Sequence, residues 1–184
     1  PYHVMAHLLT KDAKRNEQIV FDIVVALENR RFPLVLSDRK EHLATIEAAI
    51  RDLISKETGL SAEIYRFDGK VSSKQRAIHL NEISNARSSG ARVCLLSTSS
   101  LIGEGFDLPE LDTLVITMPL SFKGRLVQYA GRLHRVADGK KDVLIHDYVD
   151  SSCAMTLNMY HNRLKTYAKM GYKVEAPTEL FGLI

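Results

Sequence analysis

The apolar positions of this chain recur at two spacings, one typical of helices and one typical of buried strands. Apolar residues spaced three or four apart cover residues 12–30, 43–58, 153–170 and a stretch that begins at Ser72 or Ser73. Gly59 follows the second stretch, and we expect it to adopt the left-handed conformation that ends many helices. The positions expected to face inward are Ile19, Ile23 and Leu27, then Leu43, Ile46, Ile50, Leu53 and Ile54, then Ala77, Leu80 and Ile83, and finally Leu157, Tyr160, Leu164 and Tyr167.

Short apolar runs alternate with these helical stretches. They are Pro33–Leu36, a segment around Ile64–Phe67, Ala91–Leu96, Thr113–Thr117 and Asp142–Val149. Nearly continuous apolar runs are typical of parallel strands that are covered on both faces. Because a right-handed crossover lays its helix against the sheet, the order predicts an α/β fold with a doubly wound parallel sheet. Ligands of such sheets bind beyond the carboxyl ends of the strands, where we expect the chemistry.

Composition narrows the class of protein without identifying it. With 184 residues, 45% of them hydrophobic, the chain can bury one core without disulfide or metal staples. The net charge is only +3, so nucleic-acid binding has to be argued from local motifs. Cys94 and Cys153 show neither disulfide nor zinc-ligand spacing, so we expect a reducing cytoplasm and no metal site. The apolar stretch Ile19–Leu27 contains Asp22 and is too short to span a bilayer, and the start at Pro1 suggests a fragment of a longer protein.

The sharpest chemical pattern is Gln128-Tyr-Ala-Gly-Arg-Leu-His-Arg135, on a helix that follows Pro119. Spacings of four and three residues predict that Gln128, Arg132 and Arg135 share one helical face, and Gly131 would leave that face bare. Two guanidiniums one turn apart suit phosphate oxygens. The structural alternative is a solvated basic face, and the pattern alone does not separate the two.

The loop Leu96–Pro109 begins where a strand is expected to end, one strand before the arginine helix. Its hydroxyl residues at positions 97–100 can donate to phosphate or cap a short helix, and Gly105 permits a tight turn. Glu104 and Asp107 are carboxylates beside the expected anion site, which suggests contact with ribose, water or an arginine. An N-cap followed by turn glycines and a salt-bridged acid is an equally good interpretation.

Together the two segments resemble motifs V and VI of superfamily 2 helicases, in the order and spacing of that family. EGFDLP followed by LDTLVITMPLSFKGRLVQYAGRLHR is similar to type III restriction-enzyme motor subunits and related DNA repair helicases. It differs from DEAD-box RNA helicases, whose motif VI usually opens with His-Arg where this chain has Gln128 and Tyr129. Leu34–Ser37 with Asp38 and Arg39 resembles motif IV, and Phe67–Lys70 with Arg76 resembles the region after it.

This resemblance covers roughly residues 30–150 and implies the second RecA-like domain of a P-loop helicase. ATP then lies between two such domains, and the resemblance makes Arg135 the arginine finger, with Arg132 beside it and Gln128 near the phosphates or the attacking water. The other positions that it assigns to the nucleotide site are Gly105, Asp107, Glu104 and Gly131.

The chain lacks a GxxxxGK[ST] loop and an Asp-Glu pair at the end of a strand. We therefore expect the first RecA-like domain of the same parent protein to supply these residues and most of the Mg²⁺ coordination. On this interpretation the fragment alone is inactive as an ATPase.

Three further positions match the family's contacts with the sugar-phosphate backbone of nucleic acid, namely Ser37, Gly69 and Thr98. Each has a structural alternative, as a strand-end cap, a turn glycine and a helix N-cap respectively. Duplex DNA is the expected track rather than RNA, on resemblance alone.

The expected organisation is a helical lead-in at residues 1–30, the RecA-like domain at 31–150 and a terminal helix and tail at 151–184. Two other classes stay open. One is the nucleotide-sugar-binding half of a transferase, and the other is a nucleic-acid-binding module without catalysis.

Overall fold

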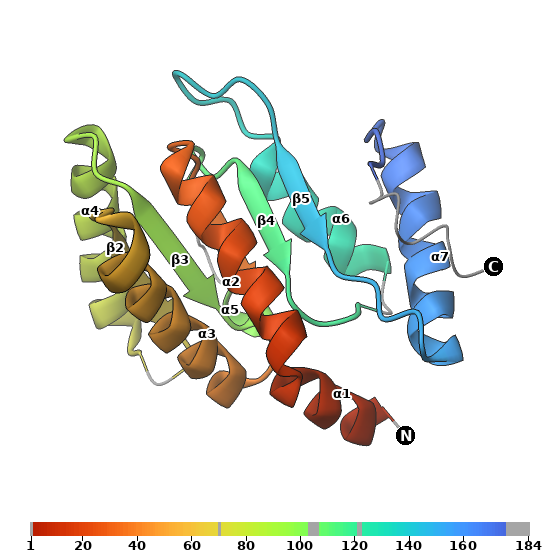
Figure 1. Cartoon of the computed structure of the whole chain (residues 1–184). Coiled ribbons are helices and arrows are strands. Elements are labelled where there is room, and N and C mark those ends of the chain that lie inside the picture. Colours follow the sequence, from red (N-terminus) through yellow and green to blue (C-terminus); the bar gives the residue numbers. More distant parts are fainter. Residues whose placement is uncertain (1, 70, 103–106, 121–122, 176–184) are drawn as a thin grey trace. The chain divides into compact units, whose positions relative to one another are not determined.

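Two consecutive helices, α1 (Tyr2–Lys11) and α2 (Ala13–Glu28), open the chain in the computed structural model, which describes residues 2–69, 71–102, 107–120 and 123–175 (Figure 1). Asp12 separates the two helices and caps the second, because its side chain accepts a hydrogen bond from the backbone N–H of Arg15 at 3.0 Å. The helix expected at residues 12–30 is confirmed.

The strands of the described residues form a five-stranded sheet in which every pair is parallel. Their order is β2-β3-β1-β4-β5, so the chain goes from the central β1 to the edge strand β2, returns to β3 between them, and continues through β4 to β5 on the other side of β1. The predicted doubly wound α/β fold is confirmed. The strands are β1 (Pro33–Leu36), β2 (Glu63–Phe67), β3 (Val93–Ser97), β4 (Thr113–Ile116) and β5 (Leu144–Asp147).

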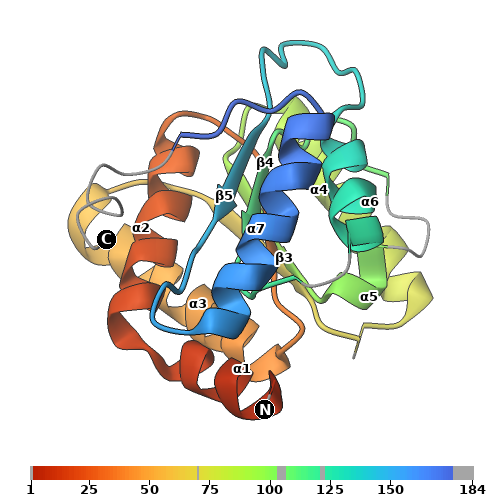
Figure 2. The ribbon, with the colours of Figure 1, turned by 90° about the vertical axis from the view of Figure 1, so that its right-hand side faces the viewer.

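Helices cover both faces of this sheet. Helices α2 and α3 (Lys40–Leu53) lie on one face, and α4 (Ser73–Ser88) lies on the other (Figures 1 and 2). The core under α2 and α3 includes Val35, Leu96 and Val115 from three neighbouring strands. Every residue of β1, β3 and β4 is buried, so each of these strands is covered on both sides, as its apolar run predicts. Helix α4 contacts β2 and β3.

The helix boundaries follow the local capping residues. Helix α3 continues into a short π-helical turn, Ile54–Thr58, and Gly59 then adopts φ +60°, as the sequence predicts. Ser72 caps α4 by accepting from the N–H of Gln75 at 3.2 Å. The inward face of α4 is partly different from the expected one, because Ala77 is exposed and Ala86 is buried instead.

Among the described residues, 119–120, 123–128 and 149–175 belong to a second compact unit. It contains the start of α6 (Lys123–Leu133) and α7 (Ala154–Lys169), where a helix was expected at 153–170. Within this unit Arg163 is buried and donates to the carbonyl of Leu120 at 3.1 Å. Of the four positions expected to face inward on α7, Tyr167 is buried and the others are half-buried.

No helix among the described residues is long and apolar enough to cross a membrane. The predicted domain boundaries at residues 30 and 150 stay predictions.

Candidate functional site

The arginine segment leaves its helix before Arg135. Helix α6 ends at Leu133, and the backbone N–H of Arg135 contacts the carbonyl of Arg132 at 3.5 Å in a turn. The expectation that Gln128, Arg132 and Arg135 share one helical face is therefore wrong for Arg135, while Gln128 and Arg132 lie one turn apart on α6. Gly131 leaves open space, since a Cβ added there meets no atom within 4 Å among the described residues.

Arg135 pairs with the loop that follows β3. Its guanidinium donates to the carboxylate of Asp107, so the two sequence segments that resemble motifs VI and V meet in the structure. The Arg135 side chain is 48% exposed and that of Asp107 is 61% exposed, so the pair stays open to solvent and to an incoming anion. The sequence offered two interpretations of Asp107 that involve an arginine, a functional contact beside the anion site and a structural salt bridge. The observed pair agrees with both. Gly105 and Glu104 lie outside the described residues.

A lysine that the sequence patterns did not single out joins the same two segments. The ammonium of Lys140 donates to the carbonyl of Arg135 at 2.9 Å and to the carbonyl of Pro109 at 3.0 Å. A turn presents it, in which the N–H of Lys140 contacts the carbonyl of Ala137 at 3.3 Å and Gly139 adopts φ +79°. The Asp-Gly pair before Lys140 was the available sequence signal for this turn.

Burial lowers the pKa of the Lys140 ammonium, and the carboxylates of Asp112 and Glu110 act in the opposite direction. The position therefore combines partial desolvation with acidic neighbours that favour the charged form.

The predicted backbone-binding positions lie along the carboxyl edge of the sheet. The N–H of Ser37, after β1, contacts the carbonyl of Ser97 at 3.3 Å, and the N–H of Thr98 donates to the carbonyl of Phe67 at 3.1 Å. Gly69 follows two residues after Phe67, is exposed and adopts φ +81°. The parallel sheet thus aligns the ends of β1, β2 and β3, which bear Ser37, Gly69 and Thr98.

The Ser37 side chain is engaged within the protein. It is 1% exposed, its hydroxyl lies 3.1 Å from Nδ1 of His42, and it accepts from the N–H of Arg39 at 3.2 Å. Nε2 of His42 lies 2.9 Å from the side-chain oxygen of Asn16, whose amide donates to the carbonyl of Thr10 at 3.0 Å. These contacts correspond to the strand-end cap that the sequence left open, and the predicted contact of Ser37 with nucleic acid stays a prediction.

The charge state of His42 fits this arrangement. Burial, together with the positive charge of Arg15, lowers the pKa of His42 to about 4. The imidazole is then neutral near pH 7, and one hydrogen-bond pattern satisfies all groups: the Ser37 hydroxyl donates to Nδ1 and Nε2–H donates to Asn16. We call Ser37, His42, Asn16 and Thr10 the polar chain.

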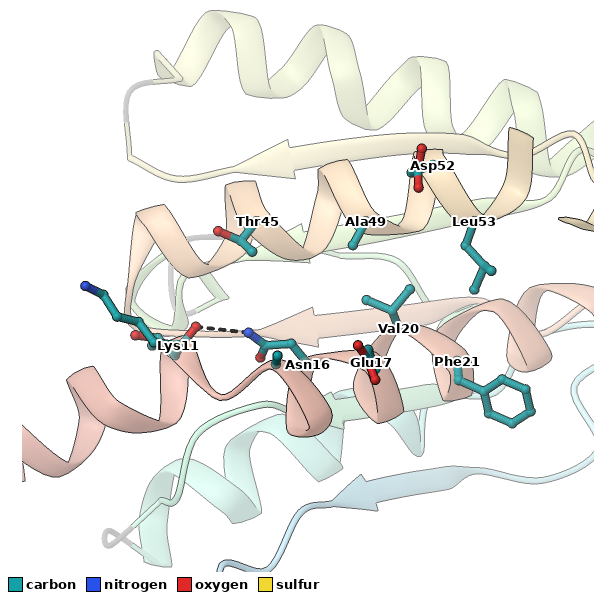
Figure 3. Close-up of a pocket in the computed structure, with 11 residues that line it drawn as sticks. Lys11, Asn16, Glu17, Val20, Phe21, Thr45, Ala49, Asp52 and Leu53 are labelled. Carbon is teal, nitrogen blue, oxygen red and sulfur yellow. Dashed lines mark hydrogen bonds between the residues drawn. The ribbon is translucent and has the colours of Figure 1, made fainter. Parts of the chain in front are cut away.

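A separate hollow of about 850 Å³ lies between α2 and α3 (Figure 3). Val20, Phe21 and Leu53 give it an apolar wall, and Glu17 and Asp52 add two carboxylates. Acidic side chains disfavour phosphate, and none of the motif residues lines this hollow. We therefore do not assign the nucleotide site to it. The described residues also contain no group of His, Cys, Asp or Glu arranged to hold a metal ion.

Comparison with known families gives a match over residues 15–137, to the family "Helicase conserved C-terminal domain". That match includes Asn16, Ser37 and His42 of the polar chain, and the whole segment from Gln128 to Arg135. Among curated proteins, "Probable helicase D10" of Escherichia phage T5 is 27% identical over 143 residues. The alignment covers 76% of this chain and 28% of that protein, so the chain spans less than a third of its relative.

Solved structures share the fold at low sequence identity. The crystal structure of T4 UvsW has a TM-score of 0.68 at 19% identity, over 92% of this chain and 35% of that one. The C-terminal part of the Fun30 ATPase domain has a TM-score of 0.59 at 16% identity, over 84% and 43%. Domain 2 of the DEAD-box helicase Mss116p, solved bound to an RNA duplex, has 0.58 at 15%, over 72% and 49%. The predicted RecA-like fold is confirmed by these neighbours.

Proposed function

The chain belongs to the family of helicase conserved C-terminal domains, and on that premise we propose that it is the second RecA-like domain of an ATP-driven superfamily 2 helicase or translocase. Its parent protein would bring the first RecA-like domain, with the phosphate-binding loop and most of the Mg²⁺ coordination. DNA is the proposed track, and restriction or repair the proposed setting, in the cytoplasm. This part of the proposal rests on the motif VI sequence that resembles restriction motor subunits.

The contact between Arg135 and Asp107 is the observation that carries the proposal. It joins the end of α6 to the loop after β3, the two segments whose sequences resemble motifs VI and V. A half-exposed guanidinium held by one carboxylate is oriented, yet it keeps donors available for phosphate oxygens. The residues present therefore fit a nucleotide phosphate.

We assign Arg135 the role of arginine finger, which stabilises negative charge on the transferring phosphoryl group. Arg132 lies one turn from Gln128 on α6, and both would face the phosphates or the attacking water. Bound ATP supplies the transferable phosphoryl group, and Asp107 holds the guanidinium of Arg135 before ATP arrives. The ends of β1, β2 and β3 would contact the sugar-phosphate backbone through Ser37, Gly69 and Thr98, which requires no base-specific contact.

The test is the ATPase rate of the full-length parent, measured without nucleic acid and with single-stranded and duplex DNA and RNA. Loss of an arginine finger lowers kcat by about 10³- to 10⁵-fold, and we expect Arg135→Ala to fall in this range. Arg51→Ala is the matched control, because Arg51 is an exposed arginine on α3 that pairs with Glu47.

Stimulation by DNA together with loss of activity in Arg135→Ala would support the motor and identify its track. Stronger stimulation by RNA would overturn the choice of DNA. Full activity of both Arg135→Ala and Arg132→Ala would leave the chain as a nucleic-acid-binding module without catalysis.

A further inference from the structure

Two independent links connect the segment that follows α6 to the loop that follows β3. One is the side-chain pair of Arg135 with Asp107, and the other is the Lys140 ammonium between the carbonyls of Arg135 and Pro109. The first link uses one nitrogen of the Arg135 guanidinium, the same group that is assigned to the phosphate. The second link holds only backbone carbonyls, so it persists whatever the Arg135 side chain binds.

The Lys140 link acts at the backbone of Arg135 itself. Helix α6 ends at Leu133, and the N–H groups of His134 and Arg135 still contact the carbonyls of Ala130 and Arg132, at 3.3 and 3.5 Å. Carbonyls at the end of a helix have no donor within the helix. The carbonyl of Arg135 instead accepts from the ammonium of Lys140 at 2.9 Å. Hydrogen bonds from a charged donor are roughly twice as strong as neutral ones. The bond from Lys140 to the Arg135 carbonyl is exposed, and the bond from the same ammonium to the Pro109 carbonyl is partly buried.

Backbone contacts within the turn fix the position of Lys140. The N–H of Lys140 contacts the carbonyl of Ala137, and Gly139 adopts φ +79°, which other residues rarely adopt. Burial lowers the pKa of the Lys140 ammonium, and the carboxylates of Asp112 and Glu110 oppose this effect. Arg135 and Lys140 also line the same hollow of about 260 Å³, so the lysine sits beside the backbone that it holds.

The geometry points to Lys140 as a positioning residue for the arginine finger: its ammonium fixes the backbone of Arg135 against Pro109 and thereby sets where the guanidinium reaches. This inference rests on the proposed function and adds to it a residue outside the motif. Lys140 does not contact the nucleotide in this assignment, so its loss should lower kcat while leaving the KM for ATP almost unchanged.

The test is a double-mutant cycle in the full-length parent, with nucleic-acid-stimulated ATPase as the readout. Lys140→Met keeps the length of the side chain and removes its charge and donors. A displacement of about 1 Å at a catalytic group can cost about 100-fold in rate, so we expect kcat to fall about 10- to 100-fold, with KM within about twofold. In the Arg135→Ala background the same substitution should change kcat by less than about twofold, because the group that it positions is gone.

Two further variants complete the design. Lys141→Met, at the neighbouring exposed lysine, should leave kcat and KM at the wild-type values. Lys140→Arg keeps the charge and N–H donors, so it should recover most of the kcat that Lys140→Met loses. This recovery can be measured even if Lys140→Met loses activity through poor folding.

The outcomes separate the inference from the proposed function. If Arg135→Ala keeps wild-type activity, the arginine-finger assignment fails, and the inference fails with it. If Arg135→Ala is inactive while Lys140→Met has wild-type kcat, the positioning role alone is overturned. Equal losses in both backgrounds, or no recovery by Lys140→Arg, would also overturn it.

Discussion

Protonation of His42 should destabilise this fold as the pH falls below neutrality. The imidazole is 2% exposed and accepts the Ser37 hydroxyl through Nδ1, so a proton on Nδ1 would remove the acceptor and place a charge near Arg15. Lowered to about 4 in the folded protein, the pKa of His42 lies well below the ordinary value of 6.5. The unfolded chain therefore binds this proton first.

The sign and the magnitude follow from linkage. Between about pH 6.5 and about pH 4 the unfolded state holds more protons, so the free energy of unfolding decreases as the pH falls, and the loss stops once folded His42 is also protonated. The difference between the pKa of 6.5 and that of about 4, at 1.36 kcal/mol per pH unit, gives about 3 kcal/mol. This is a large share of the roughly 5–15 kcal/mol typical of domains.

Urea unfolding of wild type and His42→Gln between about pH 7.5 and about pH 4 measures this effect. Glutamine does not titrate, so the stability of wild type relative to His42→Gln should fall by about 3 kcal/mol over this range. His7→Gln, at an exposed histidine, is the matched substitution elsewhere in the chain. A pH-independent difference in stability between wild type and His42→Gln would refute the reasoning.

Two other predictions concern the contacts of Arg31 and the reactivity of the two cysteines. Arg31 donates to Thr113, Asp142 and the carbonyl of Asp112, so Arg31→Met should lower the free energy of unfolding by about 2–3 kcal/mol in urea, whereas Arg51→Met should cost less than about 1 kcal/mol. Burial raises the pKa of the Cys94 thiol, while hydrogen bonds from backbone N–H groups, that of Thr156 first, lower the pKa of Cys153. A thiol reagent should thus label Cys153 quickly in the native protein and Cys94 only after unfolding, and rapid native labelling of Cys94 would contradict the structure.

Local patterns predicted the central strands well, because a strand that is buried on both faces has a continuous apolar run in its sequence. The apolar run Pro33–Leu36 has the same first and last residues as β1, and Gly59 adopts the predicted left-handed conformation. The expected strand at 142–149 is shorter, because Asp142 pairs with Arg31 instead and β5 begins at Leu144, which is 40% exposed. At this strand hydrophobicity alone overestimates the length.

Long-range contacts account for what the sequence did not reveal at the candidate site. The motif spacing identified Arg135 and Asp107, and the structure joins them. The spacing did not predict that α6 ends before Arg135, nor that the ammonium of Lys140 joins the carbonyl of Arg135 to that of Pro109, which lies far away in the sequence. The His42 contacts with Ser37 and Asn16 likewise join residues from three elements, and no periodicity encodes such a set.

The position of β1 at the centre of the sheet also has a consequence for folding kinetics. Among the strands that the structure describes, β1 comes first in the sequence, yet it pairs Leu34 with Leu95 of β3 and with Leu114 of β4, so both of these partners are synthesised later. Non-local parallel pairing folds slowly, because the loops must close before the contacts form. During that interval Pro33–Leu36 is an exposed apolar segment, and refolding yield should fall with rising protein concentration as these segments associate between chains.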